Sequence, residues 1–117
     1  MELIRAPWFI LEDPERPGEY LVMSAGERRF VLIWTAKDEA EAFLRGNPAA
    51  KGMRPLELAD RRFKEVFLEA ARRLGAEYAL FGYQPGLHEA PAAPIEKLLE
   101  LVAEDGLLAG EAPVGED

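Results

Sequence analysis

The segment Arg29-Phe30-Val31-Leu32-Ile33-Trp34-Thr35 carries the strongest strand signal in the chain, because β-branched and aromatic residues follow one another without interruption. Residues 78–83 (Tyr-Ala-Leu-Phe-Gly-Tyr) are apolar at both sets of alternating positions, as is typical of a strand covered on both faces. Helical patterns separate the two segments. We therefore expect two strands joined by a right-handed crossover, in a sheet with helices packed against it.

Three shorter segments add strands to this pair. Residues 8–11 (Trp-Phe-Ile-Leu) form an apolar run, and residues 19–24 precede a glycine-containing turn that leads into 29–35, which predicts an antiparallel hairpin. Residues 53–58 fit a short edge strand, although Pro55 weakens that pattern. The order β-β-β-α-(β)-α-β-α predicts an α+β fold: a small mixed or antiparallel sheet of four or five strands with three helices packed on it.

The first predicted helix follows the central strand directly. Thr35 is placed to cap its amino end, and Asp38 three residues later resembles the second half of a capping box. Gly46 is expected to stop this helix as the residue just beyond its last turn, and Asn47-Pro48 prevents its continuation.

Two further helices have clearer apolar periodicity. Asp60 is placed to cap the second, and Gly75 ends it. A third helix begins at Ile95 and is expected to stop at Gly106, after a loop over residues 84–94. The second helix carries its apolar residues at spacings of three and four, which predicts one buried stripe made of Phe63, Val66, Phe67, Ala70, Ala71 and Leu74.

Length and composition fit one globular domain and remove several chemistries. The chain has 117 residues, of which 49% are hydrophobic and 31% charged, so we expect a single domain over residues 1–110 and a frayed acidic tail over residues 111–117. Cysteine is absent and histidine occurs once, which excludes disulfides, thiolate nucleophiles and a two-histidine metal site within one chain. No glycine-rich phosphate loop is present. The sequence predicts no cofactor and no metal.

The charge balance argues against nucleic acid as a partner. Asp plus Glu number 22 and Lys plus Arg 14, for a net charge of -8, and phosphate binding requires clustered cations. No apolar run approaches the ~20 residues that a membrane span needs, and the chain begins without a basic leader, so we expect a cytoplasmic protein that binds no membrane. The many charges with few Asn, Gln and Cys residues are typical of thermophile proteins, and a GC-rich genome would give a similar bias.

Three stretches together carry a resemblance to a known family. They are residues 30–35 with Ala40-Glu41-Ala42-Phe43, the helix over residues 63–74, and Tyr78–Gly86 with its Gln84-Pro85-Gly86 turn. This arrangement resembles the SseB-type N-terminal domain and related small uncharacterised bacterial families. Trp34 stands where that family more often has Phe, and Gln84 where it more often has Asn. The resemblance implies a fold and no established catalytic residues, so no functional site follows from it.

Five residues are candidates for a ligand or interface contact. Trp8 and Trp34 lie on predicted strands, where they either pack in the core or present aromatic rings to a partner. Thr35 and Tyr83 are placed at strand ends, where ligands often bind in sheets with crossover helices, and His88 follows in the next loop. His88 fits a solvated loop histidine as well as a contact residue, and we name no catalytic residue.

Two functions remain open. The first is a non-enzymatic protein-interaction or regulatory module that binds a protein partner or a second copy of itself as a homodimer. The second is a small-molecule-binding domain with its pocket near the ends of strands 29–35 and 78–83. A hydrolase or isomerase that uses His88 and carboxylates is a third hypothesis, but the sequence attaches no reaction to it.

Overall fold

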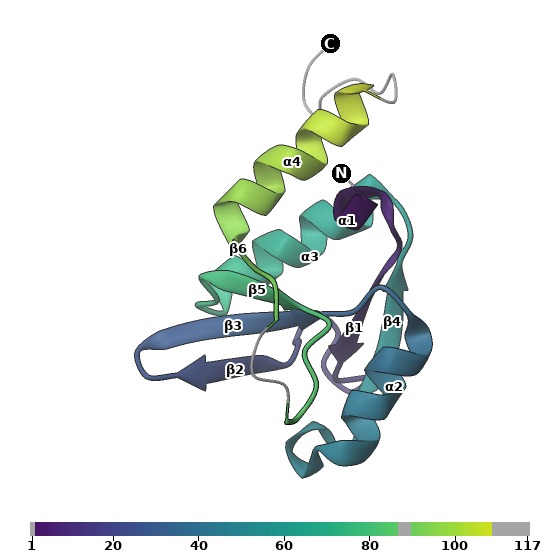
Figure 1. Cartoon of the computed structure of the whole chain (residues 1–117), viewed down its shortest axis with the longest axis vertical. Coiled ribbons are helices and arrows are strands. Elements are labelled where there is room, and N and C mark those ends of the chain that lie inside the picture. The colour runs from purple at the N-terminus through teal and green to yellow at the C-terminus, as the bar shows by residue number, and fades with distance from the viewer. Residues whose placement is uncertain (1, 87–89, 109–117) are drawn as a thin grey trace.

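Two β-sheets with helices packed on them form the framework of the chain, and the structure, a computed structural model, describes residues 2–86 and 90–108 (Figure 1). The α+β class with a mixed sheet is confirmed. None of the helices in these ranges is both long and apolar enough to cross a bilayer. In chain order the elements are α1 (Glu2–Arg5), β1 (Trp8–Glu12), β2 (Val22–Ala25), β3 (Arg28–Ile33), α2 (Lys37–Gly46), the short 3-10 helix η1 (Pro48–Ala50), β4 (Arg54–Leu58), α3 (Arg61–Arg73), β5 (Tyr78–Phe81), β6 (Ala92–Pro94) and α4 (Ile95–Leu108).

The larger sheet has the strand order β2-β3-β5-β6. Its inner pair, β3 and β5, is parallel, in a register that places Phe30 beside Tyr78, and the outer pairs are antiparallel. The two segments that decide the fold are therefore parallel neighbours, as expected. The smaller sheet pairs β1 with β4, and the predicted hairpin and the edge strand containing Pro55 are both present. The sheets meet where Phe9 and Trp34 exchange N–H···O bonds of 2.7 and 2.9 Å.

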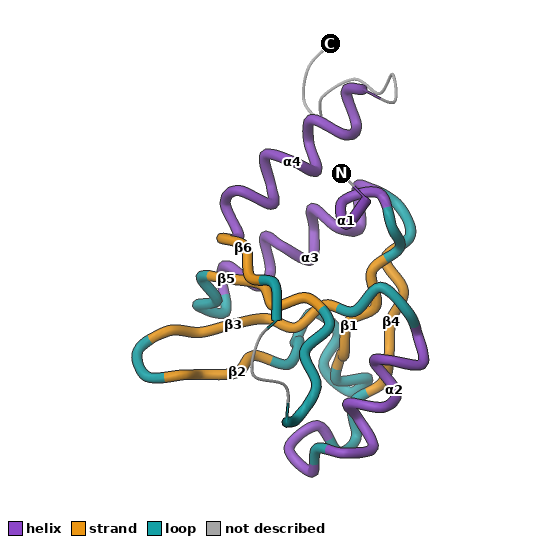
Figure 2. The backbone as a smooth tube through the Cα atoms, viewed as in Figure 1, coloured by secondary structure: helices purple, strands orange, loops and turns teal. Residues whose placement is uncertain are grey.

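The core consists of two hydrophobic clusters, one on each face of the larger sheet. Successive residues of a strand point to opposite faces. Val31 and Ile33 of β3 accordingly pack in a cluster with buried residues of α3 and α4, whereas Leu32 pairs with Trp34 in a cluster that includes Phe43 of α2. Figure 2 shows the helices at both sides of the strands. The prediction of a sheet covered on both faces is confirmed.

The helix ends follow the sequence signals in one case and depart from them in another. The Asp60 side chain accepts a hydrogen bond of 3.1 Å from the Phe63 N–H, so it caps α3 as predicted. At α2 the cap position belongs to Ala36, which has no side-chain oxygen, so the prediction of Thr35 as the cap is wrong by one residue. Gly46 is the last helical residue rather than the one beyond it, because Asn47 takes an extended conformation and caps η1 instead.

Three elements differ from the sequence prediction. The short helix α1 has no periodic pattern of its own, and contacts with α3 and β1 hold it. Residues 92–94, expected to be loop, pair with the edge of β5, where a proline at the end of a strand is tolerated. The helix α4 continues past Gly106 to Leu108, since a helical glycine costs only ~1 kcal/mol relative to alanine.

The buried face of α3 covers only part of the predicted apolar stripe. Phe67 and Ala71 are buried as expected, but Phe63 and Val66 are each 58% exposed, so their assignment to the core is wrong. Lys64, which lies outside the stripe, is only 3% exposed. Periodicity identifies the apolar side of a helix, but it does not reveal how much of that side the neighbouring elements cover.

Candidate functional site

The carboxyl ends of the parallel strands bring three of the predicted site residues to one edge of the sheet. Trp34 is fully buried, and its indole N–H donates a hydrogen bond of 2.8 Å to the Tyr83 carbonyl. Phe43 of α2 lies against both rings, at centroid distances of 5.0 Å from Trp34 and 6.1 Å from Tyr83. Thr35 and Tyr83 are half-buried there. Aromatic side chains therefore cover the carboxyl ends of β3 and β5, and α2 supplies one of them, Phe43.

Trp8 lies apart from that group, in the cluster on the other sheet face. Its ring is fully buried and meets Phe81 edge-on at 5.8 Å, while its indole N–H donates to the Leu3 carbonyl at 2.7 Å. Both tryptophans thus pack in the core, and neither presents a ring to solvent. His88 lies outside the described residues.

Two surface cavities occur at other places in the fold. One, of about 390 Å³, lies at the start of β5 and α4, between Arg72, Tyr78 and Glu96, at the opposite end of β5 from Tyr83. The other, of about 330 Å³, lies beside the end of α2 and includes Arg45 and Lys51. Thr35 and Tyr83 line neither cavity. Within residues 2–86 and 90–108, no group of three or more His, Asp or Glu side chains is arranged to hold a metal ion.

Of the large apolar side chains in the described residues, the two most exposed lie on one flank of α3. Phe63 and Val66 are exposed there, and Ala70 continues the same side of the helix one turn further on. The opposite flank is covered: the side chains of Arg61 and Glu65, which form an ion pair, are 11% and 25% exposed. We refer to Phe63, Val66 and Ala70, with Arg62 and Arg73 at their outer border, as the α3 flank.

Neighbouring elements explain why this flank is open. Helix α4 lies alongside α3, and α1 lies beside the amino end of α3 (Figures 1 and 2). On the side of the α3 flank, the Tyr20 ring contacts Phe67 at 4.8 Å, and Tyr20 leads into β2, the edge strand of the larger sheet. No described strand pairs with the outer side of β2. Phe67, one turn beyond Phe63, is thus covered by the Tyr20 ring rather than by another helix.

Lys64 determines which way α3 faces. Its ammonium donates hydrogen bonds of 2.6 Å to the Ile4 carbonyl and 2.7 Å to the Ala6 carbonyl, and it lies 5.0 Å from the centre of the Trp8 ring. Burial lowers the pKa of Lys64, although the nearby carboxylates of Asp105 and Asp60 oppose that change. Because these bonds direct position 64 inward, Val66, which lies about 200° further around the helix, points toward solvent, whereas Phe63, about 100° from Lys64, lies at the border of the buried face.

The α3 flank carries positive charge in a chain that is acidic as a whole. Arg62 and Arg73 are exposed, and neither forms an ion pair or a side-chain hydrogen bond with the rest of the described chain. Arg72 is engaged with Glu69 at 2.6 Å. The structure therefore presents two available guanidinium groups beside two exposed apolar side chains.

Comparison with known families places the chain among proteins whose role is not established. The model of a family described as protein of unknown function (DUF3234) matches residues 5–99. The chain belongs to the DUF3234 family. The part that matches DUF3234 contains every strand of the described residues and all of α2 and α3, including the α3 flank. No curated protein matches the chain. The resemblance to the SseB-type domain stays a prediction, since what is shown is membership of a family of unknown function.

The sequence contained a partial signal for the α3 flank. The apolar residues of α3 span from Val66 around to Leu68, which is wider than a helix packed on one neighbour requires. Arg62 and Arg73 lie next to Val66 on the helix surface, so the apolar stripe has a basic border on that side. The sequence pattern does not give the positions of α1 and α4. Those positions decide which edge of the apolar stripe of α3 stays exposed.

Proposed function

We propose that this protein is a protein-interaction module and that it binds a helical segment of another protein on the α3 flank. The observation that carries the proposal is the exposure of Phe63 and Val66, at 58% each, on a helix whose position is fixed by buried contacts. Scattered single apolar residues are common on protein surfaces, but adjacent large ones on one helix side are typical of binding sites. Partner helices commonly insert apolar side chains along such a surface.

Charge favours a different protein over a second copy as the occupant. The α3 flank as defined contains two bases, Arg62 and Arg73, and no acid, which is a local charge of +2, and the nearby Glu69 is paired with Arg72. A symmetric dimer would place this surface against its own copy, because a two-fold interface uses the same patch twice. Like charges would then face each other at short range. The homodimer is therefore an outcome to be tested, not the preferred occupant.

The two apolar side chains can supply only part of the binding free energy. Fully covering a side chain of this size is worth ~1.5–3 kcal/mol relative to leaving it exposed, and each is already partly covered. A micromolar complex requires ~8 kcal/mol. The partner must therefore also contact the neighbouring half-buried residues, such as Ala70 and Tyr20, and the polar border of the flank.

A selection of helical peptides against the intact protein tests this proposal. Peptides from a displayed library are selected on the native chain and then measured on a Phe63→Ser/Val66→Ser variant. The matched control is Leu3→Ser, which removes another exposed apolar side chain, on α1. We expect the selected peptides to bind the native chain and the control alike, and to lose at least tenfold in affinity on the double variant.

Two results would contradict the proposal. One is a set of selected peptides that bind the double variant as tightly as the native chain, or the absence of any binder that depends on these residues. The other is a native mass spectrum that shows a dimer which dissociates in the double variant but not in the control. That second result would make a second copy of the chain the occupant.

A small-molecule-binding domain is the second candidate function. The cavity of about 390 Å³ favours it, since ligand pockets usually measure ~300–1,000 Å³. A ligand present at about 100 times its dissociation constant stabilises a protein by ~2.7 kcal/mol, which a thermal-shift screen of nucleotides, amino acids and sugar phosphates detects. An unchanged melting temperature across these three classes would count against this candidate.

A further inference from the structure

We infer that the helix bound by the α3 flank is acidic, with two carboxylates about three turns apart that pair with Arg62 and Arg73. This inference rests on the proposed function and specifies the chemistry of its partner. The alternatives are an uncharged apolar helix and a basic one.

The positions of the two arginines on α3 give the spacing. Residues 62 and 73 differ by eleven positions, which is close to three full turns, so both side chains lie on one line along the helix. At 1.5 Å per residue they are about 16 Å apart. Val66 lies between them near that line, and Phe63 and Ala70 form the adjacent line toward the sheet. An occupant therefore meets an apolar centre with a cation near each end.

The ion-pair pattern of α3 explains why these two cations are available. Arg61 pairs with Glu65 on the covered flank, and Arg72 pairs with Glu69. Lys64 is committed to the carbonyls of the N-terminal segment. Arg62 and Arg73 are left facing solvent without an acidic partner among residues 2–86 and 90–108. Guanidinium groups suit two-pronged contacts with carboxylates, so acids are their natural partners.

The overall charge of the chain does not prevent an acidic helix from docking. The net charge of -8 acts at a distance, where salt screens it with a decay length of ~8 Å at physiological ionic strength. At contact distance, the charges nearest the bound helix determine the interaction. These are the two arginines and the single acid Glu69, which is already paired with Arg72. We therefore expect the binding to depend on salt and on the charge of the partner.

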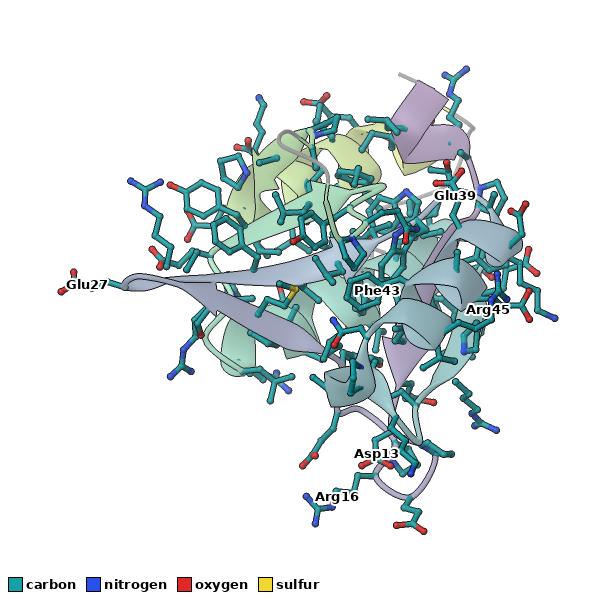
Figure 3. All side chains as sticks on the ribbon, turned by 60° about the horizontal axis from the view of Figure 1, so that its bottom comes forward. Asp13, Arg16, Glu27, Glu39, Phe43 and Arg45 are labelled. Carbon is teal, nitrogen blue, oxygen red and sulfur yellow. The ribbon has the colours of Figure 1, made fainter. Side chains whose placement is uncertain are left out.

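The experiment uses one of the selected helical peptides in two versions. One version carries Glu, and the other Lys, at the two positions eleven residues apart that flank its apolar anchors. Both are measured on the native chain, on Arg62→Glu/Arg73→Glu, and on Arg45→Glu/Lys51→Glu. The last variant makes the same change in net charge elsewhere: Arg45 lies on α2 (Figure 3), and Figure 1 shows α2 at a different place in the fold from α3.

We expect the Glu peptide to bind the native chain at least tenfold more tightly than the Lys peptide at low salt, and the difference to shrink as salt is added. The Arg62→Glu/Arg73→Glu variant should reverse the preference, while the Arg45→Glu/Lys51→Glu variant should retain it. Equal binding of both peptides to the native chain overturns the acidic partner but leaves the docking surface intact. If the preference is lost equally in both variants, only the net charge matters and the inference is wrong. If no selected peptide depends on Phe63 and Val66, the proposed function itself fails.

Discussion

Replacement of Lys64 by methionine tests whether one ammonium group fixes the N-terminal segment and the orientation of α3. Methionine has a similar length and removes the charge and the hydrogen-bond donor. In the native chain the Lys64 ammonium bonds the Ile4 and Ala6 carbonyls at 2.6 and 2.7 Å. Without it, these two carbonyls lose their donor, and the contact with the Trp8 ring becomes purely apolar.

The expected loss follows from these contacts. Hydrogen bonds to a charged group contribute ~1.5–3 kcal/mol each, so two of them amount to about 3–6 kcal/mol. Part of this is offset, because burying an ammonium group is itself unfavourable, as the lowered pKa of Lys64 indicates. We expect a net loss of about 2–4 kcal/mol in the free energy of unfolding. At ~4 °C for each kcal/mol, the melting temperature should fall by roughly 8–16 °C.

Urea unfolding and amide hydrogen exchange together check this prediction. Urea unfolding measures the loss in free energy, and exchange should become faster in residues 2–8 of Lys64→Met than in the strands of the larger sheet. Lys97→Met is the control, because that lysine is exposed and its ion pair with Glu100 spans 3.7 Å. A Lys64→Met protein within about 0.5 kcal/mol of the native chain would refute the reasoning.

Three other changes have defined outcomes. Trp34→Phe should lose about 1–3 kcal/mol of stability in thermal unfolding, because it removes the 2.8 Å hydrogen bond to the Tyr83 carbonyl and leaves a void; an unchanged melting temperature would contradict this. Gly75→Ala should lose about 1–2 kcal/mol, since φ at this position is 92° and a Cβ would lie 2.9 Å from the Arg29 guanidinium; equal stability would show that the turn relaxes freely. Burial raises the pKa of Tyr20 above its usual 10.0, so the unfolded phenol ionises first and native stability falls as the pH rises above that value. Tyr20→Phe should lose less stability in that alkaline range, and parallel pH profiles for the two proteins would be evidence against this assignment.

The strands were largely predictable because their signal is local. The run of β-branched and aromatic residues in β3 and the apolar segment of β5 leave few other structures for those residues. The capping role of Asp60 was equally predictable, because a capping side chain acts within one turn of its own position. Elements held by distant contacts were not predictable. The four residues of α1 depend on Lys64, about 60 positions later in the chain, and β6 forms because the edge of β5 is available.

The candidate site shows the same dependence on contacts between residues that are distant in the sequence. Thr35 and Tyr83 were expected at neighbouring strand ends, and both follow the carboxyl ends of the parallel strands β3 and β5. Of the two roles left open for Trp34, core packing is the one seen, because its ring packs with Phe43, which also lies beside the Tyr83 ring. Conversely, Phe63 has the sequence pattern of a core residue and becomes a surface residue only because no element covers that side of α3. Whether an apolar side chain serves packing or binding is decided by its neighbours.

The separation of the two tryptophans gives the protein a built-in pair of optical reporters. Trp8 and Trp34 lie in different hydrophobic clusters, on opposite faces of the larger sheet. In Trp8→Phe and Trp34→Phe proteins, the remaining indole fluoresces from one cluster alone. Emission and far-ultraviolet circular dichroism are therefore followed on the same variant, and coincident midpoints in each variant would mean that both faces of the sheet melt as one cooperative unit. An emission midpoint that departs from the circular-dichroism midpoint of the same variant would mean that the α2 side and the α3–α4 side are separate folding units that share a sheet.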